Sequence, residues 1–327
     1  MTGHREESHK NLMLFSGRAY PELTAEIGVA LGVEPVPTEA YDFANGEIFV
    51  RFEESVRGCD AFVVQSMTAP INQWLMEQLI MVDTLKRASA KRITVVVPFY
   101  PYARQDKKHR GREPISARLV ADMYKVAGAD RIMAVDLHTS QIQGFFDGPV
   151  DHLFGLPILA DYLSRRVDVT ESVVVSPDSG RVRVAERLTD RLRIPSPLAF
   201  IHKRRDALRP NTIASADVVG EVEGRTCIVV DDLIDTAGTI VKATEALLEA
   251  GAREVIVAAT HAVLSGPAVD RLKNAPIAEV VTTNTLPIGP DRLFDKLTVL
   301  SIAPLIADAI RAVFTDGSVT SLFDGAA

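Results

Sequence analysis

Three aspartates and a turn of small, hydroxyl-bearing residues lie close together in residues 226–240, TCIVVDDLIDTAGTI. Asp231 and Asp232 are adjacent, and paired carboxylates accept hydrogen bonds from sugar hydroxyls or contact Mg²⁺. The turn that follows opens a helical pattern, where free backbone N–H groups bind phosphate. It consists of Asp235, Thr236, Ala237, Gly238 and Thr239. Helix capping accounts for one such side chain but not for all of them, so the segment predicts a sugar-phosphate site.

Two basic segments offer positive charge to a phosphorylated ligand. Residues 99–116, FYPYARQDKKHRGREPIS, follow an apolar, strand-like run, whereas residues 200–212, FIHKRRDALRPNT, show no strong period. A solvated loop is the ordinary explanation of a basic run. The position of the first segment directly after an apolar strand favours a polyphosphate ligand instead.

Two polar side chains follow other strand-like runs. His138 lies two residues after Asp136 in VDLHTSQIQGFFDGPVDHL, residues 135–153, and its residue type alone suits a general acid or base. Asp178 follows VVVSP and precedes a helical pattern, so capping that helix is the alternative to binding a ligand. Open α/β sheets bind ligands at such strand ends.

The elements that must position these residues are β-branched runs alternating with segments of helical spacing. DAFVVQS, RITVVVPF, RIMAVDL and TCIVVDD show the first pattern, and INQWLMEQLIMVDTLKRA and GTIVKATEALLEA show the second. Continuous apolar strands between helices indicate parallel sheets that are covered on both faces. The sequence therefore predicts an α/β fold.

The chain also resembles itself. VRGCDAFVVQSMT, residues 56–68, is echoed by VEGRTCIVVDDLI, residues 222–234, and the patterns that follow recur in the same order. A duplicated domain explains this order better than the similar strand–helix sequence patterns that unrelated α/β domains share. The first copy has Gln65, Ser66 and Thr68 where the second has its three aspartates, so the sugar-phosphate site is expected in the second copy.

The 327 residues are enough for two domains that each bury a core. The expected division is a flexible tail at 1–10, an N-terminal domain at 11–154, a C-terminal domain at 155–313 and a second tail at 314–327. The join falls near FDGPVDHLFGLP, which is rich in Gly and Pro.

Composition excludes several classes of protein. A net charge of −7 argues against general nucleic-acid binding, which requires a basic face. Cys59 and Cys227 lie in apolar runs, which predicts buried free thiols in a reducing compartment. No apolar stretch approaches the length of a membrane span, and the polar start MTGHREESHK lacks an apolar signal region. A cytoplasmic protein without nucleic-acid or membrane partners is expected.

Residues 226–240 resemble the phosphoribosyl-binding motif of the phosphoribosyltransferase fold, and the chain from Asn11 to its last helix resembles the ribose-phosphate pyrophosphokinases. The resemblance implies two tandem, duplicated phosphoribosyltransferase-type domains, with ribose 5-phosphate on the aspartate pair and the 235–239 turn. It implies Mg²⁺ ligands at His138 and Asp178 and catalytic groups at Lys203 and Arg205. The ATP-binding residues that it implies are Phe43, Asn45, Gly46, Glu47, Arg104 and Gln105.

The same resemblance implies the activity and its regulation. The family transfers the β,γ-diphosphoryl group of ATP to the 1-hydroxyl of ribose 5-phosphate with Mg²⁺, releasing AMP. Its members form homo-oligomers, commonly hexamers, and many are activated by phosphate and inhibited by ADP. The effector site corresponds here to Ser55, Arg57 and Ser89, with parts of SQIQGFFD.

The chain departs from the family pattern at three places. Asn45 stands where many bacterial members have Asp, and Ala237 stands where many have Gly. Ser179-Gly180-Arg181 follows Asp178, where relatives often show Gly-Gly, and the added charge of Arg181 either serves the structure or faces phosphate.

Three other functions share parts of this pattern. A phosphoribosyltransferase has the sugar-phosphate motif but needs neither the second α/β copy nor the ATP-type segments. A non-catalytic regulatory homologue is disfavoured by the presence of His138, Asp178, Lys203 and Arg205. An RNA-binding regulator on the transferase fold fits poorly with the net charge of −7.

Overall fold

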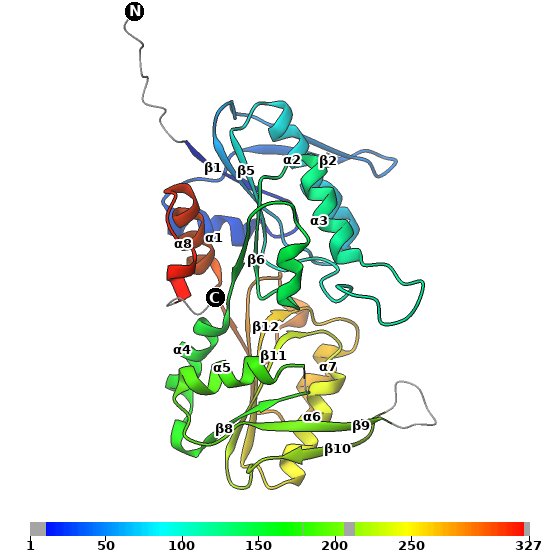
Figure 1. The fold of residues 1–327 in the computed structure, drawn as a ribbon, viewed down its shortest axis with the longest axis vertical. Coiled ribbons are helices and arrows are strands. Elements are labelled where there is room, and N and C mark those ends of the chain that lie inside the picture. The colour runs from blue at the N-terminus through cyan, green and yellow to red at the C-terminus, as the bar shows by residue number, and fades with distance from the viewer. Residues whose placement is uncertain (1–10, 179, 206–212, 324–327) are drawn as a thin grey trace, which may run out of the picture. The chain divides into compact units, whose positions relative to one another are not determined.

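The computed structural model describes residues 11–178, 180–205 and 213–323, and the side chains of residues 203–205 and 213–216 lie outside this description. The chain divides into two compact units (Figure 1). The first unit comprises Met1–Leu153 and Ala303–Ala327, and the second comprises Phe154–Ile302. Each has its own sheet and its own hydrophobic core.

The first unit is built around a parallel sheet with the strand order β1-β4-β5-β6-β7. Its strands are β1 (Leu12–Ser16), β4 (Asp60–Val64), β5 (Arg92–Val97), β6 (Arg131–Val135) and β7 (Val150–Leu153). Its helices are α1 (Pro21–Leu31), α2 (Ile71–Arg87), α3 (Ser116–Ala127) and α8 (Ala303–Phe314). β2 (Thr38–Asp42) and β3 (Ile48–Phe52) form an antiparallel hairpin that is not part of this sheet. Phe15, Val63 and Val95 pack with Val82 of α2 and Ala121 of α3 in one core.

The second unit has the strand order β10-β9-β8-β11-β12-β13-β14, parallel except where β10 pairs with β9. Its strands are β8 (Ser172–Ser176), β9 (Ala199–Arg205), β10 (Ile213–Val219), β11 (Thr226–Ile234), β12 (Glu254–Ala262), β13 (Glu279–Thr283) and β14 (Leu297–Leu300). Its helices are α4 (Leu156–Arg166), α5 (Val182–Leu192), α6 (Gly238–Glu249) and α7 (Ala268–Asn274).

Alternate residues of β11 enter different cores on the two faces of this sheet. Val229 packs with Leu247 of α6 and Leu272 of α7, whereas Ile228 packs with Leu163 of α4 and Leu188 of α5. A strand covered on both faces must be apolar throughout, which is why its sequence shows no alternation. The predicted class, α/β with mainly parallel sheets flanked by helices, is confirmed.

The two sheets share one topology. The order β1-β4-β5-β6-β7 of the first unit recurs as β8-β11-β12-β13-β14 in the second. In the first unit Ser16 of β1 pairs with Val64 of β4, and in the second Val175 of β8 pairs with Val229 of β11. This agreement is what a duplicated domain predicts, with β9 and β10 as the addition to the second copy.

The last helix does not follow the division expected from the sequence, which placed residues up to 313 in the C-terminal domain. In Figure 1, α8 lies beside α1, and both belong to the first unit. Ile306 and Ile310 of α8 are fully buried, and the guanidinium of Arg311 donates to the carbonyl of Ala30 at 2.9 Å. The expected C-terminal tail also needs correction, because Phe323 is buried. The expected tail at 1–10 lies outside the described residues.

One strand is longer than the sequence predicted, and one segment interpreted as a loop is part of a strand. β11 continues through Asp231 and Asp232 to Ile234, because its pairing with β12 extends to Ile234 opposite Ala262. Residues 200–205 of the second basic segment are part of β9, which pairs with β10, and are not a solvated loop.

Candidate active site

The predicted phosphate turn joins β11 to α6 in the second unit. Ala237 has a φ of 59° and stands immediately before Gly238, the first residue of α6. This left-handed turn brings the N-terminus of α6, with its free N–H groups, directly after the strand. Arg271 of α7 supports the turn, because its Nη1 donates to the carbonyl of Thr236 at 2.9 Å. The N–H of Ser265 donates to the carbonyl of Asp235 at 2.9 Å.

The aspartate pair of β11 is held by Arg181. The guanidinium Nε lies 3.0 Å from Oδ1 of Asp231, and Nη2 lies 2.8 Å from Oδ2 of Asp232. The N–H of Asp232 also donates to Oδ1 of Asp231 at 2.8 Å. Burial raises the pKa of Asp231 well above its usual range, the charge of Asp232 raises it further, and the charge of Arg181 opposes both. From the sequence, Arg181 was described only as an added charge. Its contacts with the aspartate pair were not predicted, because these partners lie about fifty positions further along the chain.

Asp178 follows β8 and shapes the loop before α5. Its Oδ1 accepts the N–H of Gly180 at 2.9 Å, and its carbonyl accepts the hydroxyl of Ser176 at 2.6 Å. The N-cap residue of α5 is Arg181, so Asp178 does not cap that helix in the way the alternative interpretation required. The turn presents the Asp178 carboxylate at the carboxyl end of β8, the edge at which such sheets bind ligands.

In the first unit, His138 lies in a turn just after β6 that the buried Asp106 and the half-buried His152 contact. The N–H of Leu137 donates to Nε2 of His152 at 2.9 Å. Asp106 is buried, and its Oδ2 accepts the hydroxyl of Thr139 at 2.7 Å and the amide of Gln141 at 2.6 Å. Asp106 therefore ties the basic segment 99–116 to the His138 turn. No local sequence pattern predicts this contact, because Asp106 and Thr139 are more than thirty positions apart.

The residues of the predicted ATP site lie in two places within the first unit. Arg104 and Gln105 are exposed in the basic segment, and Oε1 of Gln105 accepts the hydroxyl of Ser116 at 2.7 Å. Phe43, Asn45, Gly46 and Glu47 form the turn of the β2–β3 hairpin. There Oδ1 of Asn45 accepts the N–H of Glu47 at 3.1 Å, a bond that needs the oxygen shared by Asn and Asp.

The predicted effector residues come together in the first unit. Ser55 and Arg57 line a cavity of about 400 Å³ with Ala88, the residue that precedes Ser89. The carbonyl of Ser89 accepts the N–H of Gly58 at 2.8 Å, which joins the two segments. The lining is mixed, because Arg51 and Arg57 are basic, Glu54 is acidic, and Phe49, Val50, Phe52 and Val56 are apolar.

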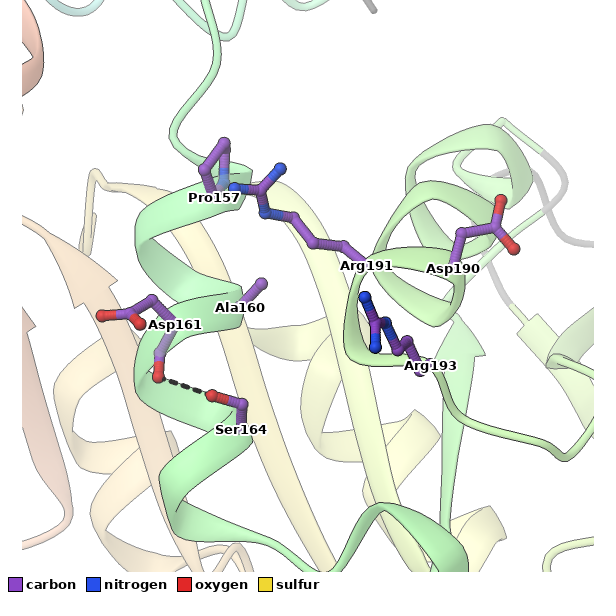
Figure 2. Close-up of a pocket in the computed structure, with 7 residues that line it drawn as sticks. All are labelled: Pro157, Ala160, Asp161, Ser164, Asp190, Arg191 and Arg193. Carbon is purple, nitrogen blue, oxygen red and sulfur yellow. Dashed lines mark hydrogen bonds between the residues drawn. The ribbon is translucent and has the colours of Figure 1, made fainter. Parts of the chain in front are cut away.

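A second cavity, of about 440 Å³, lies between α4 and α5 in the second unit and contains none of the predicted site residues (Figure 2). Pro157, Ala160 and Ser164 line it from α4, and Arg191 and Arg193 lie on its other side. This is the C-terminal end of α5, whereas the aspartate pair faces Arg181 before its N-terminus.

Lys203 and Arg205 lie in β9, but their side chains are outside the described part of the structure, so their catalytic role stays a prediction. Among the described residues, no group of three or more His, Cys, Asp or Glu side chains is arranged to hold a metal ion. Mg²⁺ commonly uses one or two carboxylates together with substrate phosphates and water, so a lone carboxylate such as Asp178 fits a metal shared with a nucleotide. No helix of the described chain is long and apolar enough to cross a membrane.

Comparison with known proteins agrees with this architecture. A family model described as the N-terminal domain of ribose phosphate pyrophosphokinase matches residues 12–128, and the phosphoribosyl synthetase-associated domain matches residues 207–324. The chain is 65% identical to the ribose-phosphate pyrophosphokinase of Streptomyces coelicolor over 324 residues, 99% of each chain. It is 64% identical to that of Mycobacterium leprae over 321 residues, 98% of each chain. The crystal structure of phosphoribosylpyrophosphate synthetase from Mycobacterium smegmatis matches with a TM-score of 0.90 at 64% identity, covering 94% of this chain and 100% of that chain.

Two α/β units of one topology, with an aspartate pair and a phosphate-type turn in the second, define a protein with tandem phosphoribosyltransferase-type domains. Such a protein could still have any of several activities, because a fold alone does not fix a function. The chain belongs to the ribose-phosphate pyrophosphokinase family of diphosphoryl-transferring enzymes. The predicted family, fold class and enzymatic nature are thereby confirmed.

Proposed function

We propose that the chain transfers the β,γ-diphosphoryl group of ATP to the 1-hydroxyl of D-ribose 5-phosphate with Mg²⁺, giving 5-phospho-α-D-ribose 1-diphosphate and AMP. The bond from the sugar O1 to the β-phosphorus forms, and the bond from that phosphorus to the oxygen shared with the α-phosphorus breaks. The observation that carries the proposal is the arrangement at the end of β11, where an aspartate pair precedes a helix N-terminus in a chain that matches a pyrophosphokinase over 99% of its residues.

The sugar phosphate would be bound at two ends by one segment. The backbone N–H groups of residues 236–239 and the hydroxyls of Thr236 and Thr239 would hold the 5-phosphate. Asp231 and Asp232 would accept hydrogen bonds from the ring hydroxyls. Fixing both ends directs the 1-hydroxyl, and such positioning lowers a barrier by roughly 7 kcal/mol or more in good cases.

The nucleotide would be held by residues of the first unit: Phe43, Asn45, Gly46, Glu47, Arg104 and Gln105. Lys203 and Arg205 would stabilise the negative charge of the diphosphoryl group during transfer. His138 and Asp178 would hold Mg²⁺, which supplies positive charge to the phosphate oxygens when bound. Asp178 accepts the N–H of Gly180, and Asp106 accepts the hydroxyl of Thr139 in the turn that carries His138.

The remaining expectations concern regulation and assembly. Phosphate and ADP would act at Ser55, Arg57 and Ser89, beside the cavity that the first two line. We expect a homo-oligomer, a hexamer of the 35.6 kDa chain, in the cytoplasm. A role in nucleotide biosynthesis follows from the product.

The proposal is tested by incubating the protein with ATP, Mg²⁺ and ribose 5-phosphate in phosphate buffer and separating the nucleotides by chromatography. We expect AMP and the sugar diphosphate in equal amounts. Formation of ADP would show a simple kinase instead. Absence of any nucleotide conversion would contradict the proposal and favour the regulatory homologue.

A further inference from the structure

The β2–β3 hairpin carries four of the predicted ATP-binding residues in its turn and forms a two-stranded sheet of its own. Two paired strands alone are marginally stable in water, so the position of the turn depends on contacts with the rest of the first unit. At the end away from the turn these contacts are apolar, because Phe52 packs on Phe15 with ring centroids 4.6 Å apart. At the turn end Tyr41 and Phe43 are 41% and 46% exposed, so apolar burial contributes less there.

Polar contacts to Asp42 hold the turn end of the hairpin. Asp42 pairs with Ile48 as the last strand residue before the turn, and Phe43 follows it directly. Nη2 of Arg18 lies 2.6 Å from Oδ1 of Asp42, and Nε2 of Gln73 donates to Oδ2 at 3.0 Å. Arg18 follows β1 and Gln73 lies in the first turn of α2, so two elements of the unit hold one carboxylate.

Arg18 is itself held by a carboxylate that is completely buried. Its Nε lies 2.5 Å from Oε2 of Glu77 on α2, and its backbone N–H donates to Oε1 at 2.7 Å. The guanidinium carbon is 5.9 Å from the centroid of the Trp74 ring. A buried carboxylate is unfavourable without an opposite charge, so Glu77 fixes the guanidinium. The planar fork of a guanidinium can contact Glu77 and Asp42 at once, whereas an ammonium is a point charge.

The same network occupies the strand end that carries the aspartate pair in the second unit. Gln65 follows β4 at the position that matches Asp231 in the repeat. Its Nε2 donates to Oε1 of Glu77 at 2.9 Å, and its Oε1 accepts the N–H of Ala19 at 3.2 Å. A Cβ on Gly17 would lie 2.3 Å from the Gln65 side chain, so glycine leaves the room that this amide needs. The strand end of the first unit is therefore filled by groups that lead to the hairpin.

We propose that Arg18 and Asp42 are positioning residues for the nucleotide, because their contact fixes the turn of the β2–β3 hairpin within the first unit. This inference rests on the proposed function, in which that turn binds ATP, and adds two residues that the family resemblance did not supply. It makes ATP, and not ribose 5-phosphate, the substrate whose binding depends on this contact.

The test is steady-state kinetics of the full-length protein with Mg²⁺, varying each substrate in turn. Asp42→Ala removes the contact and leaves Arg18 paired with Glu77, so it should raise KM for ATP about fivefold, the upper end of what a partly exposed ion pair contributes. KM for ribose 5-phosphate should stay within about twofold. Asp42→Asn keeps one acceptor oxygen, and its KM for ATP should be intermediate. Glu39→Ala is the matched control, because Glu39 lies on the same strand and its partner Arg51 belongs to the hairpin itself.

A double-mutant cycle separates this contact from a general loss of structure. Arg18→Lys keeps a positive charge beside Glu77 but loses the fork, so it should also raise KM for ATP. Arg18→Lys combined with Asp42→Ala should be within about twofold of Asp42→Ala alone, because both changes remove the same contact. Effects that multiply would contradict the inference, since the two residues would then act separately.

Each other outcome has a definite meaning. An unchanged KM for ATP in Asp42→Ala would overturn the inference, and a lower one would show that Asp42 repels the phosphates. Equal increases in KM for both substrates would also overturn it, because they would reflect a loosened fold. If Asp42→Ala or Arg18→Lys fails to fold, Asp42→Asn decides, and a KM for ATP equal to that of the wild type rejects the inference. Wild-type protein that forms no AMP would reject the proposed function as well, whereas the outcomes above reject the inference alone.

Discussion

The buried carboxylate of Asp106 connects a segment of the predicted ATP site to the turn that carries the predicted metal ligand His138. One of its oxygens accepts hydrogen bonds from Thr139 and Gln141, while the carboxylate itself belongs to the basic segment that carries Arg104 and Gln105. Two donors on one charged oxygen form stronger bonds than neutral pairs do. The orientation of the His138 turn therefore depends on a residue that need not touch any ligand.

Replacing Asp106 should separate these segments. Asp106→Ala leaves the donors of Thr139 and Gln141 without the carboxylate, so we expect the free energy of unfolding to fall by about 2 kcal/mol. We also expect the Mg²⁺ concentration for half-maximal activity to rise, because the His138 turn loses its support. Urea unfolding and a Mg²⁺ titration of activity measure the two effects. Asp122→Ala, at an exposed acid of α3, is the control, and equal effects from both variants would contradict the assignment.

At the scale of elements, the buried strands determine the behaviour of the two thiols. Cys59 and Cys227 are free and fully buried. Burial raises the pKa of Cys59 to about 11, with a further contribution from Asp60, and raises that of Cys227 to about 12. Because the thiolate is the nucleophile, raised pKa values and burial both suppress reaction.

We therefore expect neither thiol to react with iodoacetamide at pH 8 in the native protein. At that pH a thiol of pKa 11 is ionised to about one part in a thousand. Both thiols should react in guanidinium chloride, which mass spectrometry of the alkylated protein can show. Rapid labelling of either cysteine before unfolding would mean that its strand opens locally.

The strands could be predicted from the sequence because burial on both faces leaves an unbroken apolar run. The continuous apolar residues of β11 show this pattern, and the sequence places them directly before Asp231 and Asp232. The extension of β11 past these aspartates could not be predicted, since it depends on pairing with β12. The contacts of Arg181 and of Arg271 could not be predicted either. They depend on which helix folds over which strand, and no local spacing encodes that.

At the scale of the whole molecule, the two units do not simply follow the order of the chain, because the first unit combines segments from before and after the second. The sequence led us to expect residues up to 313 in the C-terminal domain, because they follow that domain along the chain. The structure assigns α8 to the first unit, where Arg92 also contacts Asp316 at 2.9 Å. Periodicity reports that a helix has an apolar face, and only the folded chain shows what that face contacts.

A charge on this apolar face should destabilise the first unit. Ile310→Asp places a carboxylate at a fully buried position, so we expect the free energy of unfolding to fall by about 4 kcal/mol. Hydrogen exchange should show the loss of protection in α1, which packs against α8. Asp308→Asn, on the exposed side of the same helix, is the control. Unchanged protection of α1 would contradict the assignment of α8 to the first unit.

The position of α8 also bears on how the chain folds during synthesis. Domains generally fold as units in the order in which they leave the ribosome. Here the second unit, Phe154–Ile302, is complete in sequence before α8 has been translated, whereas the first unit still lacks its last helix. The first unit therefore cannot complete the packing of α8 against α1 until residues 303–314 have been translated. A chain truncated near its end would keep every predicted site residue and still leave its first unit unfinished.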